Sequence, residues 1–120
     1  DGFVENSLKW RDSRQAIQEM RDMCAAARIP LAVLILPDFT QGFDDQYAWR
    51  PIHEAVVSWG RELGVPVFDL LIPFLGEEQL SLWVPWDGHP NAEAHRRIAE
   101  LLIARIREDS RFVRRSPSEK

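Results

Sequence analysis

The chain has 120 residues, a length that predicts a single domain. Hydrophobic residues make up 45% of it and charged residues 28%, proportions typical of a soluble globular protein. Its net charge of −4 argues against a basic surface for nucleic acid, and no apolar run approaches the ~18 residues that a membrane span requires. We therefore expect a soluble domain with no nucleic-acid partner and no membrane span, in a compartment that the composition does not specify.

Apolar residues recur at helical spacing over residues 12 to 28 and predict a first helix. Asp12 or Ser13 is expected to cap its first turn. Pro30 is expected to end it, because the residue before a proline is pushed out of the helical region. The next segment, LAVLIL at residues 31 to 36, is apolar without alternation. Such a run is typical of a strand in a parallel sheet that helices cover on both faces.

A polar loop at residues 38 to 47 leads into a second predicted helix over residues 48 to 63. Pro51 is tolerated in the first turn of this helix, and Gly64 supplies the residue that ends it. The run VPVFDLL at residues 65 to 71 is the next predicted strand. A strand, a helix and a strand within about 40 residues predict a right-handed parallel crossover.

A short helical turn is expected over residues 77 to 80, and Asn91 is expected to cap a last helix that ends near Glu108. Two apolar strands alone cannot form a sheet with both edges paired, so the pattern predicts an α/β fold that is incomplete in this chain. Residues 1–108 are interpreted as the C-terminal portion of a larger α/β domain and residues 109–120 as a polar tail. Since the chain lacks an initiator Met, we expect a piece of a longer polypeptide, and the missing signal peptide says nothing about export.

The segment WDGHPN carries an Asp and a His two residues apart, between the second strand and the last helix. In an extended segment, side chains at i and i+2 point to the same side, so Asp87 can accept a hydrogen bond from Nδ1 of His89. Nε2 would then be free to act as a general base. The turn follows a strand, in the region where open α/β sheets bind ligands. The spacing alone also fits a turn Asp beside a surface His.

The run DGHPNAEAHRRIAELL resembles the last conserved block of the SGNH (GDSL-type) serine hydrolases, and IPLAVLILPDF and GVPVFDLL resemble upstream elements of that family. The resemblance extends over roughly residues 8 to 107. It implies a three-layer α/β/α, flavodoxin-like fold and an esterase that uses neither a metal nor a cofactor. It also implies that Asp87 is the orienting carboxylate and His89 the general base. The commoner spacing in the family is Asp-x-x-His, whereas this chain has Asp-x-His.

The nucleophile that the resemblance requires is not found in this chain, because no Gly-Asp-Ser occurs. The serines lie in predicted helices, a polar loop or the tail: Ser7, Ser13, Ser58, Ser81, Ser110, Ser116 and Ser118. Asn6, in DGFVENSL, lacks the Gly-x-Asn-Asp context of the family's oxyanion residue. We assign no nucleophile and no oxyanion donor within the chain, and we expect residues outside it to supply both.

Four further residues are candidates to line a substrate pocket. Trp83 and Trp86 flank the Asp–His pair and could form the wall of an acyl or sugar pocket, with core packing left open for both. Asp38 and Phe39 follow the first strand and could line the same cleft.

Three other residues are assigned structural roles. His95 could join Asp87 and His89 in a metal site, but a helical His packed against the preceding loop is preferred, so no metal is expected. His53 is predicted to lie on a solvated helix face, and Asp69 is predicted to cap a loop.

Two functions remain open at this point. The first is the C-terminal part of a serine esterase or acyl hydrolase acting on a small-molecule or polysaccharide ester, with acetyl transfer or deacetylation of polysaccharides as variants. The second is a non-catalytic α/β module that binds a ligand or a partner. An exposed sheet edge also predicts self-association of the isolated chain.

Overall fold

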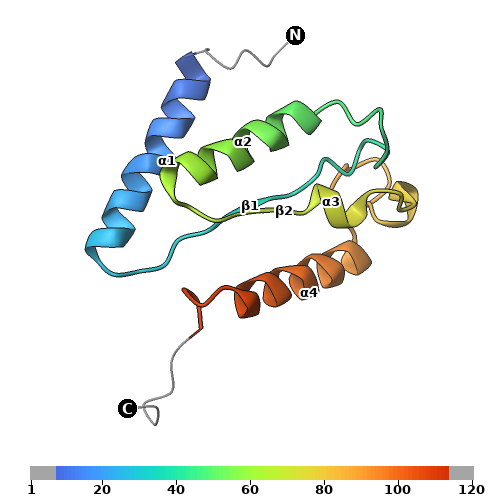
Figure 1. The fold of residues 1–120 in the computed structure, drawn as a ribbon. Helices are drawn as coiled ribbons and strands as arrows, with labels where there is room; N and C mark the ends of the chain where they lie inside the picture. The colour runs from blue at the N-terminus through green and yellow to red at the C-terminus, as the bar shows by residue number, and fades with distance from the viewer. Residues whose placement is uncertain (1–7, 114–120) are drawn as a thin grey trace.

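The computed structural model describes residues 8–113. The elements follow in the order α1 (Leu8–Ala26), β1 (Val33–Ile35), α2 (Arg50–Leu63), β2 (Val67–Asp69), α3 (Leu71–Phe74), the 3₁₀ helix η1 (Gln79–Ser81) and α4 (Ala92–Glu108). The two strands are parallel, with Val33 opposite Val67 and Ile35 opposite Asp69. Helices α2 and α4 lie on opposite sides of the strands, and α1 lies against the end of α2 (Figure 1). The predicted α/β class with a parallel strand pair is confirmed.

The strands are shorter than the sequence predicts. Each spans three residues, and none of the three residues of β1 is fully buried. Leu36, which ends the apolar run, is 45% exposed. Helices lie on both sides of the strands as predicted, but among the described residues the apolar run is only partly buried. Among these residues, β1 pairs along one edge only, with β2.

Helix α1 begins earlier than predicted. It starts at Leu8, so neither Asp12 nor Ser13 is its N-cap, and the Ser13 hydroxyl instead donates to the Lys9 carbonyl oxygen within the helix, at 2.9 Å. The additional turn carries Trp10, whose ring centroid lies 3.8 Å from that of the buried Trp59 on α2. Packing between the helices therefore overrides the local capping signal.

Helix α1 ends at Ala26 and α2 begins at Arg50, two residues from the predicted positions, whereas the predicted C-terminal end of α2 and start of α4 agree with the structure. Gly64 ends α2 in the left-handed conformation, with φ of 68°, and its amide donates to the Gly60 carbonyl. The side-chain oxygen of Asn91 accepts from the Ala94 amide at 3.0 Å, which confirms this residue as the N-cap of α4. The Asn91 side-chain amide also donates to the Ser81 carbonyl at 2.8 Å, and so ties α4 to η1.

The core lies at the carboxyl end of the strands, under the loop at residues 38–47. It contains three aromatic rings, those of Phe39, Phe43 and Phe74, with centroids 5.3 to 5.7 Å apart. The other buried members are Tyr47, Leu70, Leu71, Leu82, Ala94 and Ile98. The loops at this end of the sheet are therefore anchored in the core.

Some predictions concern residues outside the described range. Asn6 and Ser7 lie there, and so does the part of the predicted tail at residues 114–120. Within residues 109–113, the ring of Phe112 lies 6.4 Å from that of Phe68 on β2. This short segment therefore contacts the sheet.

Candidate active site at the carboxyl end of the strands

The Asp–His turn is the tip of a loop that folds back on itself. The Val84 amide donates to the His89 carbonyl at 2.8 Å, and the Asn91 amide donates to the Leu82 carbonyl at 2.9 Å. At the tip, Trp86 and Gly88 have positive φ angles of 69° and 74°. Since Asn91 also caps α4, the loop is held at its base by backbone hydrogen bonds and a helix terminus.

The hydrogen bond predicted between Asp87 and His89 is present. Oδ1 of Asp87 lies 2.7 Å from Nδ1 of His89. Because an ionised carboxylate can only accept, Nδ1 carries the proton, and Nε2 is left to exchange a proton with another group. The side chains are 58% and 76% exposed, so both lie at the surface. This is the geometry that a general base and its orienting carboxylate require.

Asp87 also changes the acidity of its partner. Its hydrogen bond and its negative charge raise the pKa of His89 above the ordinary value of 6.5. The protonated ring is therefore favoured by folding. This contribution to stability is complete below the unfolded pKa near 6.5 and is lost as pH rises through the higher folded-state pKa.

We expect an NMR titration of the His89 ring to give a pKa above 6.5. Asp87→Asn should lower that pKa toward the ordinary value, because it removes the charge while keeping the side-chain shape. Asp12→Asn, which removes a carboxylate from α1, is the matched control and should leave the His89 pKa unchanged. A pKa at or below 6.5 in the unmodified chain would contradict the hydrogen bond.

Two loops meet at this turn. A Cβ added to Gly88 would lie 2.7 Å from Cγ2 of Thr40, so the Thr40 methyl group packs directly over the glycine between Asp87 and His89. Thr40 belongs to the loop that follows β1. The structure therefore brings the loops after both strands together, as expected at the carboxyl edge of a parallel sheet.

Asp38 organises the first of these loops. Its carboxylate accepts from the Thr40 amide and hydroxyl at 2.9 and 2.6 Å, from Gln41 at 2.9 Å and from the Trp49 indole at 3.1 Å. Partial burial raises the pKa of Asp38, but these donors outweigh burial and lower it to about 2. The carboxylate is therefore engaged within its own loop.

The other three residues predicted to line a substrate cleft, Phe39, Trp83 and Trp86, do not form a common wall in the structure. Phe39 is a core residue, only 2% exposed. Trp86 is 98% exposed and therefore forms no pocket wall among the described residues. Trp83 is half-buried and packs against the core. The Asp87–His89 pair consequently lies on an open surface.

His53 corrects the prediction of a solvated helix face. It is 4% exposed, with Nδ1 2.8 Å from Oδ1 of Asp69 and Nε2 3.2 Å from the Tyr47 hydroxyl. Asp69 also accepts from the Leu71 amide at 2.9 Å, so its predicted capping role is confirmed. The Tyr47 hydroxyl accepts from the Asp38 amide at 2.8 Å. We refer to Asp69, His53 and Tyr47 as the buried chain.

This buried chain could have been suspected from topology. In a parallel crossover the first turn of the helix lies near the carboxyl end of the next strand, and His53 and Asp69 occupy those two positions. Burial raises the pKa of Asp69, but hydrogen bonds from His53 and the Leu71 amide outweigh it, so the pKa is lowered. Burial and the nearby charges of Asp38 and Asp69 raise the pKa of Tyr47.

His95 is exposed on α4, so the prediction that it packs against the preceding loop is wrong. The reason is its place on the exposed face of α4, where its backbone amide donates to the Asn91 carbonyl at 2.9 Å. Within residues 8–113, no group of three or more His, Cys, Asp or Glu side chains could hold a metal ion.

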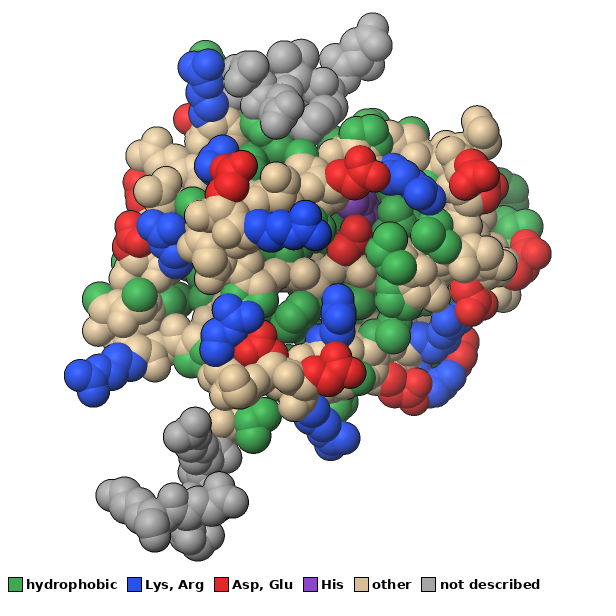
Figure 2. Space-filling model, viewed as in Figure 1, with side chains coloured by type: hydrophobic (Ala, Val, Ile, Leu, Met, Phe, Trp, Pro, Cys, Tyr) green, Lys and Arg blue, Asp and Glu red, His purple; other side chains and the backbone are tan. Residues whose placement is uncertain are grey.

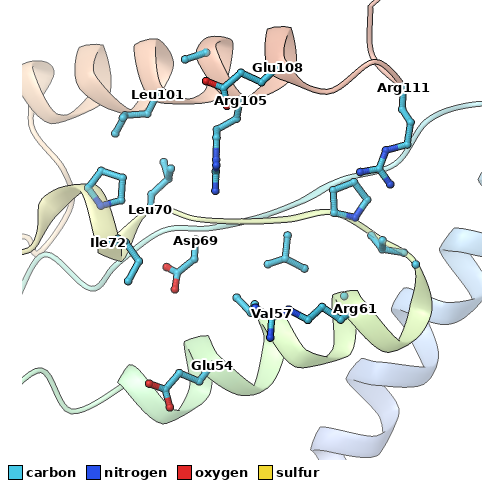
Figure 3. A pocket seen from close by; sticks show the side chains of 17 residues that line it. Glu54, Val57, Arg61, Asp69, Leu70, Ile72, Leu101, Arg105, Glu108 and Arg111 are labelled. Atoms are coloured by element: carbon cyan, nitrogen blue, oxygen red, sulfur yellow. The ribbon is translucent and has the colours of Figure 1, made fainter.

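A separate groove of about 920 Å³ follows the outer edge of β2, between α2 and α4. Charged side chains of both signs lie over this face (Figure 2). Arg105 projects from α4 toward the strand, and Asp69 projects from β2 toward α2 (Figure 3). The full lining is Glu54, Val57, Gly60, Arg61, Gly64, Val65, Pro66, Val67, Asp69, Leu70, Ile72, Pro73, Leu101, Ala104, Arg105, Glu108 and Arg111. No local sequence pattern predicts this groove, because segments distant in the sequence form it.

Fold and site together define a chain of α/β class with an oriented Asp–His pair at the carboxyl end of its parallel strands. Comparison with protein-family models, curated proteins and solved structures found no match. No helix in the described range combines the length and apolar character needed to cross a membrane.

Proposed function

We propose that this chain supplies the Asp and His of the catalytic triad of an SGNH-type serine ester hydrolase. The observation that carries the proposal is the 2.7 Å hydrogen bond between Asp87 and Nδ1 of His89, which leaves Nε2 available at the surface. The position of the pair supports it further, since the turn lies between a parallel strand and a capped helix. Neither a metal nor a cofactor is part of the proposed reaction.

In the proposed reaction, a serine from outside these residues attacks an ester carbonyl while Nε2 of His89 takes the hydroxyl proton. Asp87 stabilises the imidazolium that forms. His89 then returns the proton to the leaving alcohol, and water releases the acyl group by the same steps in reverse order. Donors for the oxyanion are also required from outside the chain. Because His89 must begin neutral, kcat/KM is expected to rise as pH passes upward through its raised pKa.

The sheet is consistent with this need for further residues. Among residues 8–113, β1 is paired along one edge, and Leu36 beside it is 45% exposed. The proposal places at least one additional parallel strand on that open edge, as in the flavodoxin-like fold of the family. That strand would bring the serine and the oxyanion donors to the same carboxyl edge as His89.

The test compares two polypeptides in the hydrolysis of p-nitrophenyl acetate. The full-length polypeptide that contains residues 1–120 should hydrolyse the ester, and residues 1–120 alone should show no rate above the uncatalysed reaction. No hydrolysis by the full-length polypeptide would contradict the proposal. Equal turnover by residues 1–120 alone would contradict the placement of the nucleophile outside them.

A binding module is the second candidate function, favoured by the groove beside β2. Among the described residues, this groove is a hollow that a ligand or a partner could occupy, and it lies apart from the Asp–His turn. In that case the Asp–His pair would be a remnant, and the full-length polypeptide would lack both ester hydrolysis and acetyl transfer to polysaccharide.

A further inference from the structure

We infer that the buried chain of Asp69, His53 and Tyr47 positions the Asp87–His89 pair, acting through the loop at residues 38–47. That this positioning serves catalysis rests on the proposed function. The structural coupling between the buried chain and the Asp87–His89 pair does not depend on that function. Asp69, His53 and Tyr47 are positioning residues, because none of the three forms a hydrogen bond with His89.

The connection between the buried chain and the Asp–His turn has two halves. The first, from Asp69 to Asp38, is a series of hydrogen bonds in which every donor has an acceptor. The carboxylate of Asp69 can only accept, so Nδ1 of His53 donates to it at 2.8 Å. In the neutral ring Nε2 then accepts from the Tyr47 hydroxyl at 3.2 Å, and the Tyr47 oxygen accepts from the Asp38 amide at 2.8 Å. His53 and Tyr47 are each 4% exposed. Water therefore has little access to replace these bonds.

The second half runs along the surface from Asp38 to the turn. Oδ1 of Asp38 accepts from both the amide and the hydroxyl of Thr40, which fixes the Thr40 side chain. The methyl group of Thr40 then packs over Gly88, where a Cβ would lie only 2.7 Å away. Gly88 separates Asp87 from His89 and has φ of 74°. A shift of the Thr40 methyl group is thus transmitted to the backbone that sets the Asp87–His89 geometry.

A polar connection in this place does more than fill space. An apolar side chain at position 53 would pack in the same volume but would not fix the backbone of Asp38. Buried hydrogen bonds select a single arrangement, because every displaced donor or acceptor is left unsatisfied. In the described residues, no buried side-chain nitrogen or oxygen lacks a partner. The arrangement is therefore complete as it stands.

The test uses two variants at opposite ends of the connection and one control. Tyr47→Phe removes the hydroxyl between His53 and Asp38, and Thr40→Ser removes only the methyl group over Gly88. Ile98→Val makes a small change in the same core and is the matched control. Two quantities are measured by NMR in each: the pKa of His89 and the exchange rate of the Asp38 amide hydrogen.

We expect Tyr47→Phe to speed exchange of the Asp38 amide hydrogen by about tenfold, the factor that corresponds to the loss of one hydrogen bond. The same variant should lower the pKa of His89 toward 6.5. Thr40→Ser should lower the His89 pKa and leave exchange at Asp38 within about twofold of the original rate, since its hydroxyl bond remains. Ile98→Val should change neither. If the His89 pKa is unchanged in Tyr47→Phe or in Thr40→Ser, or falls equally in Ile98→Val, the inference is overturned.

Because the proposed connection runs through exposed Thr40, an unchanged His89 pKa in Thr40→Ser overturns the inference even if Tyr47→Phe does not fold. Neither measurement needs a substrate, so the result is separate from the proposed function. If the variants shift the His89 pKa but the full-length polypeptide does not hydrolyse the ester, the proposed hydrolase is rejected and the positioning role is retained. If the ester is hydrolysed but the pKa does not shift, the positioning role is rejected and the hydrolase is retained.

Discussion

In the full-length polypeptide, His89→Ala is expected to lower kcat for p-nitrophenyl acetate by about 10³- to 10⁴-fold. The proposed nucleophilic serine would then have no base to take its proton. KM should change little, because in the proposed reaction His89 contacts the reacting atoms and not the acyl group. Asp87→Asn should also lower kcat strongly. Without the carboxylate at 2.7 Å, the His89 ring is no longer held in the tautomer that leaves Nε2 free to accept a proton.

His95→Ala is the matched control for this experiment. It removes an exposed imidazole from α4, six positions along the chain, and should change kcat by less than about twofold. A loss below about 100-fold in His89→Ala would remove this residue from the proposed triad. An equal loss in His95→Ala would indicate a general effect on the structure.

Gly60→Ala is expected to lower the free energy of unfolding by about 3 kcal/mol or more. Gly60 is buried where α2 crosses β2, and an added Cβ would lie 2.3 Å from Cγ2 of Val67 and 2.6 Å from the Val65 carbonyl oxygen. The backbone oxygen cannot move without displacing the strand. Alanine favours a helix over glycine by only ~1 kcal/mol, which is too little to offset the clash.

The control for Gly60 is Gly64, at the end of the same helix. A Cβ there meets nothing within 4 Å, and the only penalty comes from φ of 68°. Gly64→Ala should therefore cost about 1 to 2 kcal/mol. Urea unfolding of both variants gives the comparison, and a Gly60→Ala variant as stable as the original chain would show that α2 and β2 are not packed as described.

Local signals in the sequence were sufficient for much of the fold. Gly64 and Asn91 mark helix ends through their own backbone and side-chain chemistry, and both do so in the structure. The Asp87–His89 bond is equally local, because the two side chains lie on the same side of a short extended segment. Features that depend on residues close in sequence were therefore predictable.

The errors arise where distant segments decide the outcome. Trp10 extends α1 by packing on Trp59, a residue 49 positions later. His53 looks polar in its own helix, and only the return of the chain at Asp69 explains its burial. Phe39 follows a strand like a pocket residue, yet the rings of Phe43 and Phe74 draw it into the core. No pattern within a short window contains this information.

The central claim concerns which nitrogen of His89 carries the proton, and NMR of the ring nitrogens measures this directly. Above its pKa, neutral His89 should carry the proton on Nδ1, held by Asp87, with Nε2 bare. Asp87→Asn should weaken this preference in the same spectrum. A neutral ring with its proton on Nε2 would contradict the account, because that nitrogen could not then accept a proton from serine.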